Sequence, residues 1–213
     1  ASSAPLFSAS ETTLVKLLTR CYDPISGEIL WDGTNIREID PVQLRQRIGV
    51  VFQDFLRYEL TAKENIGLGY VDDIENLARI SDAAKRAGID NVVEKLPRGY
   101  QTTLSRWLGD SDGGVDLSGG EWQKIALARM CMRSETSEFL ILDEPSAALD
   151  AIAEHELFEH FANLMSTRTT LLISHRFSTV RMAETIAVLE SGTVTEYGTH
   201  EELIDSGKTY ANL

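Results

Sequence analysis

Short apolar runs alternate with segments whose apolar residues recur at helical spacing. This alternation occurs in the first and last parts of the chain, residues 12–53 and 138–175. Residues 48–53 (IGVVFQ), 138–144 (EFLILDE) and 169–175 (TTLLISH) are apolar runs that end in polar residues, a pattern typical of buried parallel strands. Residues 12–20 and 151–165 repeat their apolar positions at helical spacing. Strands that alternate with helices predict an α/β fold.

Turn and helix-start residues predict four smaller elements. They are a strand in 27–33 closed by a turn at Asp32-Gly33, a helix over 41–47 that begins at Pro41, a hairpin over 185–198 that turns at Ser191-Gly192, and a last helix over 200–207.

The middle of the chain has a different pattern. From residue 54 to about 137 helical repeats dominate, and they include a long helix from Ser118 to about Met132. We interpret 54–137 as an inserted helical subdomain, and 1–53 with 138–213 as the sheet-containing core.

Composition narrows the function classes. The chain has 213 residues, 43% of them hydrophobic, and a formal net charge of -13. One domain with a substantial core is expected at this length, and an acidic chain is a poor general binder of nucleic acid. The two cysteines, Cys21 and Cys131, are expected to be buried, reduced thiols, which suits a cytosolic protein.

Polar side chains stand at the ends of three predicted strands. Asp143 and Glu144 follow the second apolar run, Gln53 ends the first, and His175 ends the third. Ligands of open α/β sheets bind at the carboxyl ends of the strands, so we expect these residues to converge. An acid such as Asp143 suits Mg²⁺, and Glu144 is placed to act as a general base on water.

The predicted long helix begins with the sequence Ser118-Gly119-Gly120-Glu121. Free N–H groups at a helix start attract phosphate, and two glycines allow a nucleotide to approach the backbone closely. The alternative is a glycine-rich helix start that binds no ligand. It would explain the two glycines but not the rest of the sequence over residues 116–129.

The motifs in this order resemble the ATP-binding cassette of an ABC transporter, a P-loop NTPase with a RecA-like core and an inserted helical subdomain. The matching strings are TTLVKLL (12–18), the Q-loop VVFQD (50–54), the signature LSGGE (117–121), the Walker B string FLILDEP (139–145), the D-loop SAALD (146–150) and the switch ISHR (173–176). The strings LPRGYQT (96–102) and YGTHEEL (197–203) resemble the exporter branch.

The resemblance implies that two cassettes hold two ATP molecules head to tail, with Mg²⁺. Residues 118–121 would then face the partner's nucleotide, and Asp150 would link the two sites. Glu144 would be the catalytic base, His175 the γ-phosphate contact, and Asp143 and Gln53 would meet Mg²⁺. The implied partners are a second cassette and a transmembrane domain at the cytoplasmic face of a membrane. We expect the transmembrane domain to contact a groove near Gln53, Asp54, Phe55 and Tyr58. Ordinary packing within the subdomain is the alternative for these residues.

One segment departs from the family. Residues 5–11 read PLFSASE, where a phosphate loop G-x-x-G-x-G-K is expected. An acid replaces the lysine, and a unit charge at 4 Å is worth about 4 kcal/mol at an intermediate dielectric. The residues that would face the nucleotide by position are Ser8, Ser10, Glu11, Thr12 and Thr13, with Thr12 at the Mg²⁺-ligand position.

Residues 5–11 can also be interpreted as an ordinary helix start that binds no phosphate. Ser10 suits a helix cap and Glu11 suits the first turn of a helix. The strands that precede the loop in the family are also missing. Three explanations stay open: a truncated or frame-shifted piece of an active ATPase, which the contiguous loss favours; a silent cassette that lends its signature to a competent partner; and a non-transport ABC protein.

Overall fold

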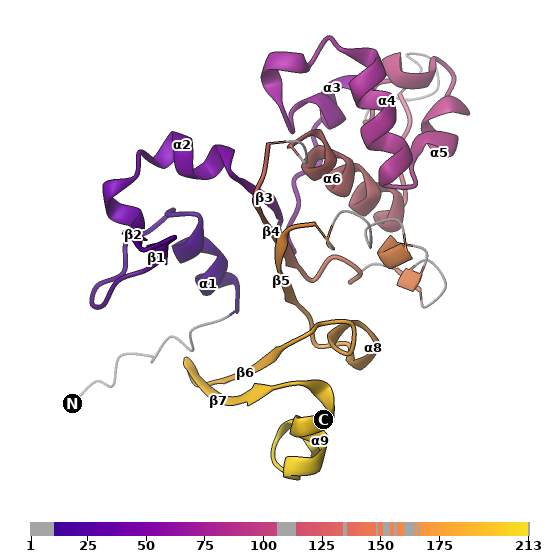
Figure 1. The fold of residues 1–213 in the computed structure, drawn as a ribbon. Helices are drawn as coiled ribbons and strands as arrows, with labels where there is room; N and C mark the ends of the chain where they lie inside the picture. Colours follow the sequence, from indigo (N-terminus) through magenta and orange to yellow (C-terminus); the bar gives the residue numbers. More distant parts are fainter. Residues whose placement is uncertain are drawn as a thin grey trace, which may run out of the picture. The chain divides into compact units, whose positions relative to one another are not determined.

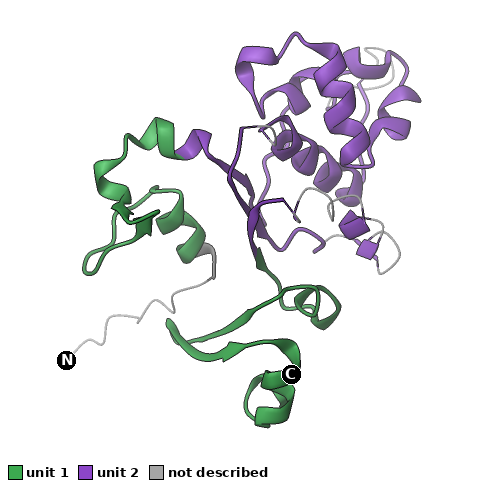
Figure 2. Ribbon diagram, viewed as in Figure 1, with its two compact units in different colours: residues 1–44, 172–213 green, residues 45–171 purple. Residues whose placement is uncertain are grey.

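The computed structural model describes residues 11–105, 114–133, 136–147, 149–150, 154–155, 157–159, 165 and 167–212. The chain divides into two compact units. Unit 1 comprises residues 1–44 and 172–213, and unit 2 comprises residues 45–171 (Figure 2). Each unit is described by itself below.

Unit 2 contains the helices that lie close together in Figure 1 in magenta and brown. They are α3 (Ala62–Gly67), the 3-10 turn η2 (Val71–Asp73), α4 (Leu77–Arg86), α5 (Asp90–Glu94), the 3-10 turn η3 (Gly99–Gln101) and α6 (Gly119–Arg133). The long helix α6 packs against α3, α4 and strand β3. Its buried side chains form the centre of this unit together with Ile66, Ile80, Leu104 and Leu140.

Side chains cap the starts of two of these helices. Thr61 and Glu64 form a reciprocal capping box at α3, and Asn76 accepts from the N–H of Arg79 at α4. The Thr61 hydrogen bonds lower the pKa of the Glu64 carboxyl, because they stabilise its charged form. These caps satisfy N–H groups that have no partner within the helix.

The path of the chain after α3 brings two backbones into close contact. A Cβ atom on Gly69 would lie 1.9 Å from the carbonyl oxygen of Arg129 in α6. The Nε of Arg133 donates to the carbonyl of Gly69 at 2.8 Å. Only glycine fits where two backbones approach this closely.

A three-stranded sheet in the order β3-β4-β5 comprises β3 (Ile48–Val51), β4 (Phe139–Asp143) and β5 (Thr169–Ile173). Strands β3 and β4 are parallel, with Ile48 opposite Phe139 and Val51 opposite Leu142. Arg47 and Glu138 form a two-pronged ion pair at the start of these strands, with N–O distances of 2.8 and 2.6 Å. This pairing confirms two of the predicted buried parallel strands, β3 and β4. Strand β5 is present, but only Ile173 is buried in it, so the prediction that this strand is buried throughout is wrong.

In unit 1, the N-terminal segment contains α1 (Glu11–Leu18), β1 (Leu30–Trp31), β2 (Thr34–Asn35), the 3-10 turn η1 (Ile36–Glu38) and α2 (Pro41–Gln46), which crosses the unit boundary. Helix α1 ends in a Schellman motif, in which the N–H of Cys21 donates to the carbonyl of Lys16 and that of Arg20 to Leu17. Arg20 takes the left-handed position of this motif, with φ 51°, where glycine is usual.

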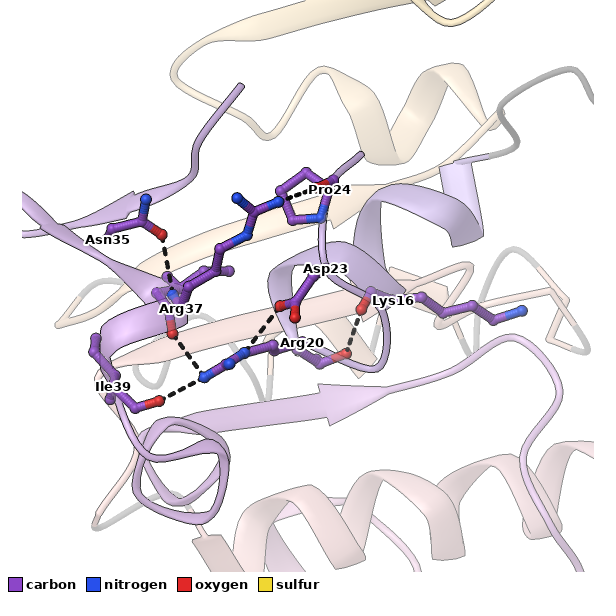
Figure 3. Close-up of polar contacts among 9 residues, drawn as sticks. Lys16, Arg20, Asp23, Pro24, Asn35, Arg37 and Ile39 are labelled. Carbon is purple, nitrogen blue, oxygen red and sulfur yellow. Dashed lines mark hydrogen bonds and ion pairs between the residues drawn. The ribbon is translucent and has the colours of Figure 1, made fainter. Parts of the chain in front are cut away.

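The side chain of Arg20 explains why an arginine stands there. Its guanidinium donates to Asp23 at 3.0 Å and to the carbonyls of Ile36 and Ile39 at 3.1 and 2.7 Å (Figure 3). Charged donors form stronger hydrogen bonds than neutral ones. Arg20 thus fastens the end of α1 to η1 despite its unfavourable backbone conformation.

The C-terminal part of unit 1 contains α8 (Phe177–Val180), β6 (Ile186–Glu190), β7 (Thr193–Gly198), α9 (His200–Ser206) and the 3-10 turn η4 (Tyr210–Asn212). Strands β6 and β7 form the predicted hairpin, with positive φ at Ser191 and Gly192. The buried side chains of Ile186, Leu203 and Tyr210 pack together beneath it. A second capping box, between Thr199 and Glu202, begins α9.

The predicted elements that fall on described residues are present. The turn at Asp32-Gly33 joins β1 to β2, α2 begins at Pro41, and α9 lies over residues 200–206. The predicted helix 151–165 lies largely outside the described residues. The two compact units divide the chain at 44/45 and 171/172. The domain boundaries predicted at 53/54 and 137/138 stay a prediction.

One prediction about the cysteines is wrong. Cys131 is buried in α6, and burial raises the pKa of its thiol to about 12, but Cys21 is exposed. Helix α1 ends at Leu18, so Cys21 lies in the turn after the helix and not on its apolar face. Neither cysteine forms a disulfide, as expected.

Candidate functional site

The carboxyl end of β4 carries the two predicted acids. Asp143 is the last residue of the strand and Glu144 is the next, and their exposed fractions are only 2% and 5%. Glu144 has φ 51°, a left-handed backbone conformation that is costly for a side chain of this size. Strained residues cluster at functional sites, since the surrounding structure must hold them in place.

Gln53 lies at the same edge of the sheet. It follows the end of β3 by two residues, and because β3 and β4 run parallel in register, their carboxyl ends coincide. Gln53 and Asp54 are both exposed. The structure therefore brings Gln53 together with Asp143 and Glu144 at one sheet edge.

His175 follows β5 by two residues and is exposed. It belongs to unit 1, whereas Gln53 and Asp143 belong to unit 2. The predicted convergence of His175 with these residues stays a prediction.

The signature segment begins α6 with a capping box. Ser118 donates to the Glu121 carboxylate from both its N–H and its hydroxyl, each at 2.8 Å, and the Glu121 N–H donates back at 3.3 Å. Gly119 and Gly120 form the first turn between them. The sequence reasoning missed this box, although the spacing Ser-x-x-Glu is its signature.

Gln123 connects the signature helix to the acids of β4. Its side-chain amide is buried and donates to the carbonyls of Glu144 and Pro145, at 3.3 and 2.5 Å. The amide thus holds the turn that contains the left-handed residue Glu144. Sequence reasoning missed Gln123, because its partners lie more than twenty residues away along the chain.

A second buried contact lies below the D-loop. The Ser146 hydroxyl donates to the Glu154 carboxylate at 2.9 Å, and both side chains are buried. The N–H of Leu149 donates to the Ser146 carbonyl, which closes a turn just before the exposed Asp150. These contacts stabilise the backbone just before Asp150. Sequence reasoning missed them, because Glu154 looks like an ordinary acid in a predicted helix.

The remaining predicted nucleotide-binding residues lie at the start of α1. Ser8 and Ser10 lie outside the described residues, and Glu11, Thr12 and Thr13 form the first turn of α1. An acid in the first turn of a helix complements the helix dipole. The loss of phosphate binding at this segment stays a prediction.

The carboxylate of Asp143, by contrast, suits a hard cation such as Mg²⁺, which prefers oxygen ligands. Among the described residues, no group of three or more His, Cys, Asp or Glu side chains converges in a way that would hold a metal by protein ligands alone. Mg²⁺ that keeps several waters and binds with phosphates needs only one or two carboxylates.

A parallel strand pair with acids at its carboxyl end beside a group of helices fits the P-loop NTPase class, and the comparisons establish that class. A sequence model of the family described as ABC transporter matches residues 11–147. The chain therefore belongs to the ABC transporter family. The match begins at the first residue of α1 and includes the signature and Walker B segments.

Two named relatives are similar to this chain over most of its length. The subtilin transport ATP-binding protein SpaT of Bacillus subtilis is 38% identical over 205 residues, which is 96% of this chain and 33% of SpaT. The mitochondrial ATP-binding cassette sub-family B member 10 of Mus musculus is 38% identical over 198 residues, 92% of this chain and 26% of the mouse protein.

A solved structure of a bacterial Atm1-family ABC exporter with ATP bound superposes with a TM-score of 0.85 at 35% identity. The match covers 96% of this chain and 34% of the exporter chain, which confirms the predicted fold class. The chain spans about a third or less of the length of these relatives. Within the described residues, no helix combines the length and apolar character needed to cross a bilayer.

Proposed function

We propose that the chain is the ATP-binding, energy-coupling cassette of an exporter-type ABC transporter, and that its signature surface acts on a nucleotide held by a second cassette. A transmembrane domain and that second cassette are its partners, which places it at the cytoplasmic face of a membrane. The names of the relatives support the class, since they include a transport ATP-binding protein and an exporter with ATP bound.

The observation that carries the proposal is the hydrogen bonding of Gln123. It joins the start of α6, which presents Ser118, Gly119 and Gly120, to the backbone of Glu144. A partner nucleotide on the signature would thus contact the same helix that holds the backbone of Glu144, the proposed general base. Rigid mutual support of this kind is what a preorganised site needs.

The predicted residues at the strand ends keep the roles that the family implies, and they would act only when a nucleotide occupies this chain's own site. Asp143 and Gln53 would meet Mg²⁺, Glu144 would take a proton from the attacking water, and His175 would contact the terminal phosphate. ATP supplies the phosphoanhydride bond whose hydrolysis drives transport. Asp150, at the end of the supported D-loop, would contact the partner cassette.

The segment before α1 determines how well this chain's own site can bind ATP. Glu11 stands where the phosphate-binding lysine is expected, and no glycine precedes it in residues 5–11. We propose that the chain binds ATP weakly or not at all through this segment. Its contribution is then a signature surface offered in trans, while a competent partner supplies the phosphate loop.

A mixing experiment tests the proposal. The chain is combined with an exporter cassette that has an intact phosphate loop and a disabled signature, and ATP hydrolysis is followed at saturating Mg²⁺ and ATP. We expect turnover only in the mixture. The matched control is Gly120→Asp, which places an acid at the start of α6 and should abolish the gain.

Calorimetric titration of the chain alone with Mg²⁺ and ATP completes the test. No heat up to millimolar ATP is expected. Micromolar ATP binding would contradict the proposal that residues 5–11 bind ATP weakly. In the mixing experiment, equal ATP hydrolysis with the Gly120→Asp variant would contradict the role of the signature.

A further inference from the structure

Arg129, on the side of α6, contacts the segment that follows Gln53. Its Nη1 donates to the carbonyl of Leu56 at 2.7 Å, and its guanidinium lies 5.0 Å from the ring centre of Tyr58. Nothing in the motif analysis pointed to Arg129, because Leu56 and Tyr58 lie about seventy residues earlier in the chain.

Asn65 makes this contact specific. Two further nitrogens of Arg129 donate to its backbone carbonyl and to its side-chain oxygen, both at 2.7 Å. The Asn65 amide nitrogen in turn donates to the carbonyls of Tyr58, Leu60 and Thr61, at 3.0 to 3.1 Å. One arginine and one asparagine thus bond to the backbone at both ends of the turn over residues 56–61.

The chemistry of the guanidinium fits this arrangement. Arginine carries its donors in a rigid planar fork and stacks on aromatic rings, whereas lysine offers a compact point charge. Burial lowers the pKa of Arg129 through the loss of hydration, and the neighbouring Tyr58 opposes that effect. The guanidinium still carries its charge at neutral pH, so its hydrogen bonds are charge-assisted.

Arg133, one turn further along α6, provides an internal comparison. It too donates to backbone carbonyls, those of Gly69 at 2.8 Å and Arg45 at 3.0 Å. Both of these partners lie outside residues 53–61. The two arginines share a helix and a bonding mode, and they differ in which segment they hold.

From these contacts we infer that Arg129 is a positioning residue that couples residues 53–61, the segment after the Q-loop glutamine, to the signature helix α6. A displacement of that segment moves α6, and with it Ser118 at its start. The coupling to nucleotide rests on the proposed function, whereas the mechanical link between the segment and α6 does not.

Tryptic cleavage after Arg57 measures the mechanical link. Arg57 is exposed, and proteolysis requires the surrounding segment to open locally. The variants are Arg129→Lys and the matched control Arg133→Lys, both of which keep the charge and the tryptic site. Cleavage rates are normalised to the same bond in the urea-unfolded chain.

We expect Arg129→Lys to cleave after Arg57 about tenfold faster than the wild type, since lysine cannot keep all three hydrogen bonds. Arg133→Lys should stay within about twofold. Equal acceleration in both variants, or none in Arg129→Lys, would overturn the inference. Tyr58→Leu removes only the stacked ring and provides a second test if Arg129→Lys fails to fold. It should accelerate cleavage after Arg57 by less than tenfold. An unchanged cleavage rate in Tyr58→Leu would contradict the inference.

The mixing assay adds the functional measurement. Arg129→Lys should lower kcat with little change in the apparent KM for ATP, because it disturbs coupling and leaves the phosphate contacts intact. A raised KM with unchanged kcat would contradict a positioning role. Proteolysis needs no nucleotide, so a wild-type chain that is silent in the mixing assay would refute the proposed function and leave the proteolysis result standing.

Discussion

Helices α6 and α1 both begin where a nucleotide phosphate is expected, and their first turns differ. At α6, Ser118 caps the helix and two glycines leave the backbone open to approach. At α1 the first residue is Glu11, and no glycine stands before it in residues 5–10. Both first turns carry an acid, Glu121 in α6 and Glu11 in α1. The difference lies in the two glycines of α6, because they let a ligand approach the N–H groups at the helix start.

The two helices are also fixed differently along their length. Helix α6 is held by backbone contact at Gly69 and by Gln123, Arg129 and Arg133. The end of α1 is held chiefly by one side chain, that of Arg20. The predictions below test this contrast, from the largest expected effect to the smallest.

Gly69→Ala should give the largest effect. Its new Cβ would lie 1.9 Å from a backbone oxygen of α6, so the helix must shift, at a cost of about 3 kcal/mol. The free energy of unfolding, measured by urea denaturation, checks this. Gly27→Ala, in the loop after α1, has no atom within 4 Å of its Cβ and only a left-handed φ of 74°, so about 1 kcal/mol is expected there.

Glu11→Lys should raise ATP binding at the start of α1. Two charge changes at about 1 kcal/mol each in water amount to about thirtyfold in affinity, measured by calorimetry at millimolar ATP. Glu201→Lys reverses the same charge in the first turn of α9 and should leave ATP binding unchanged. An equal gain from both variants would show that net charge alone is responsible.

Glu121→Gln should strengthen nucleotide binding at the start of α6. Glutamine keeps an oxygen that accepts from Ser118, and it removes a negative charge that repels phosphate at about 1 kcal/mol. The apparent ATP affinity in the mixing assay should tighten about fivefold. Glu202→Gln alters the equivalent capping box of α9, and any gain there would argue against a local effect of Glu121.

The smallest effect concerns pH. The lowered pKa of Glu64 means that its charged form stabilises the fold above its ordinary pKa of about 4.3, and this contribution disappears as pH falls through the lowered value. Glu64→Gln should therefore melt about 1 °C below the wild type at neutral pH. The difference should vanish in strong acid, and a difference that grows in acid would contradict the sign of the shift.

The sequence predicted elements whose signals are local. The turns at Asp32-Gly33 and Ser191-Gly192 need two residues with positive φ, and both positions of each have it. The apolar runs at β3 and β4 predicted parallel pairing, because their length and composition leave no polar face. Among the site residues, these strands predicted that Gln53 and Asp143 would share a sheet edge.

Contacts between distant parts of the chain were beyond such signals. Gln123 and Arg129 look like ordinary helix residues, and their roles come from partners that only the folded chain brings near. Cys21 was predicted wrongly for a related reason. The apolar pattern continued past Leu18, whereas the Schellman motif at Arg20 ended the helix first.

The different surroundings of Cys21 and Cys131 have a practical consequence. Cys21 is exposed at the end of α1, whereas the Cys131 thiol is buried with its pKa raised to about 12. Since thiolates are the species that maleimides and iodoacetamides attack, such a reagent should modify Cys21 selectively in the unmutated chain. A fluorophore or spin label placed there would report on the end of α1 in the wild-type sequence, without any cysteine having to be removed first.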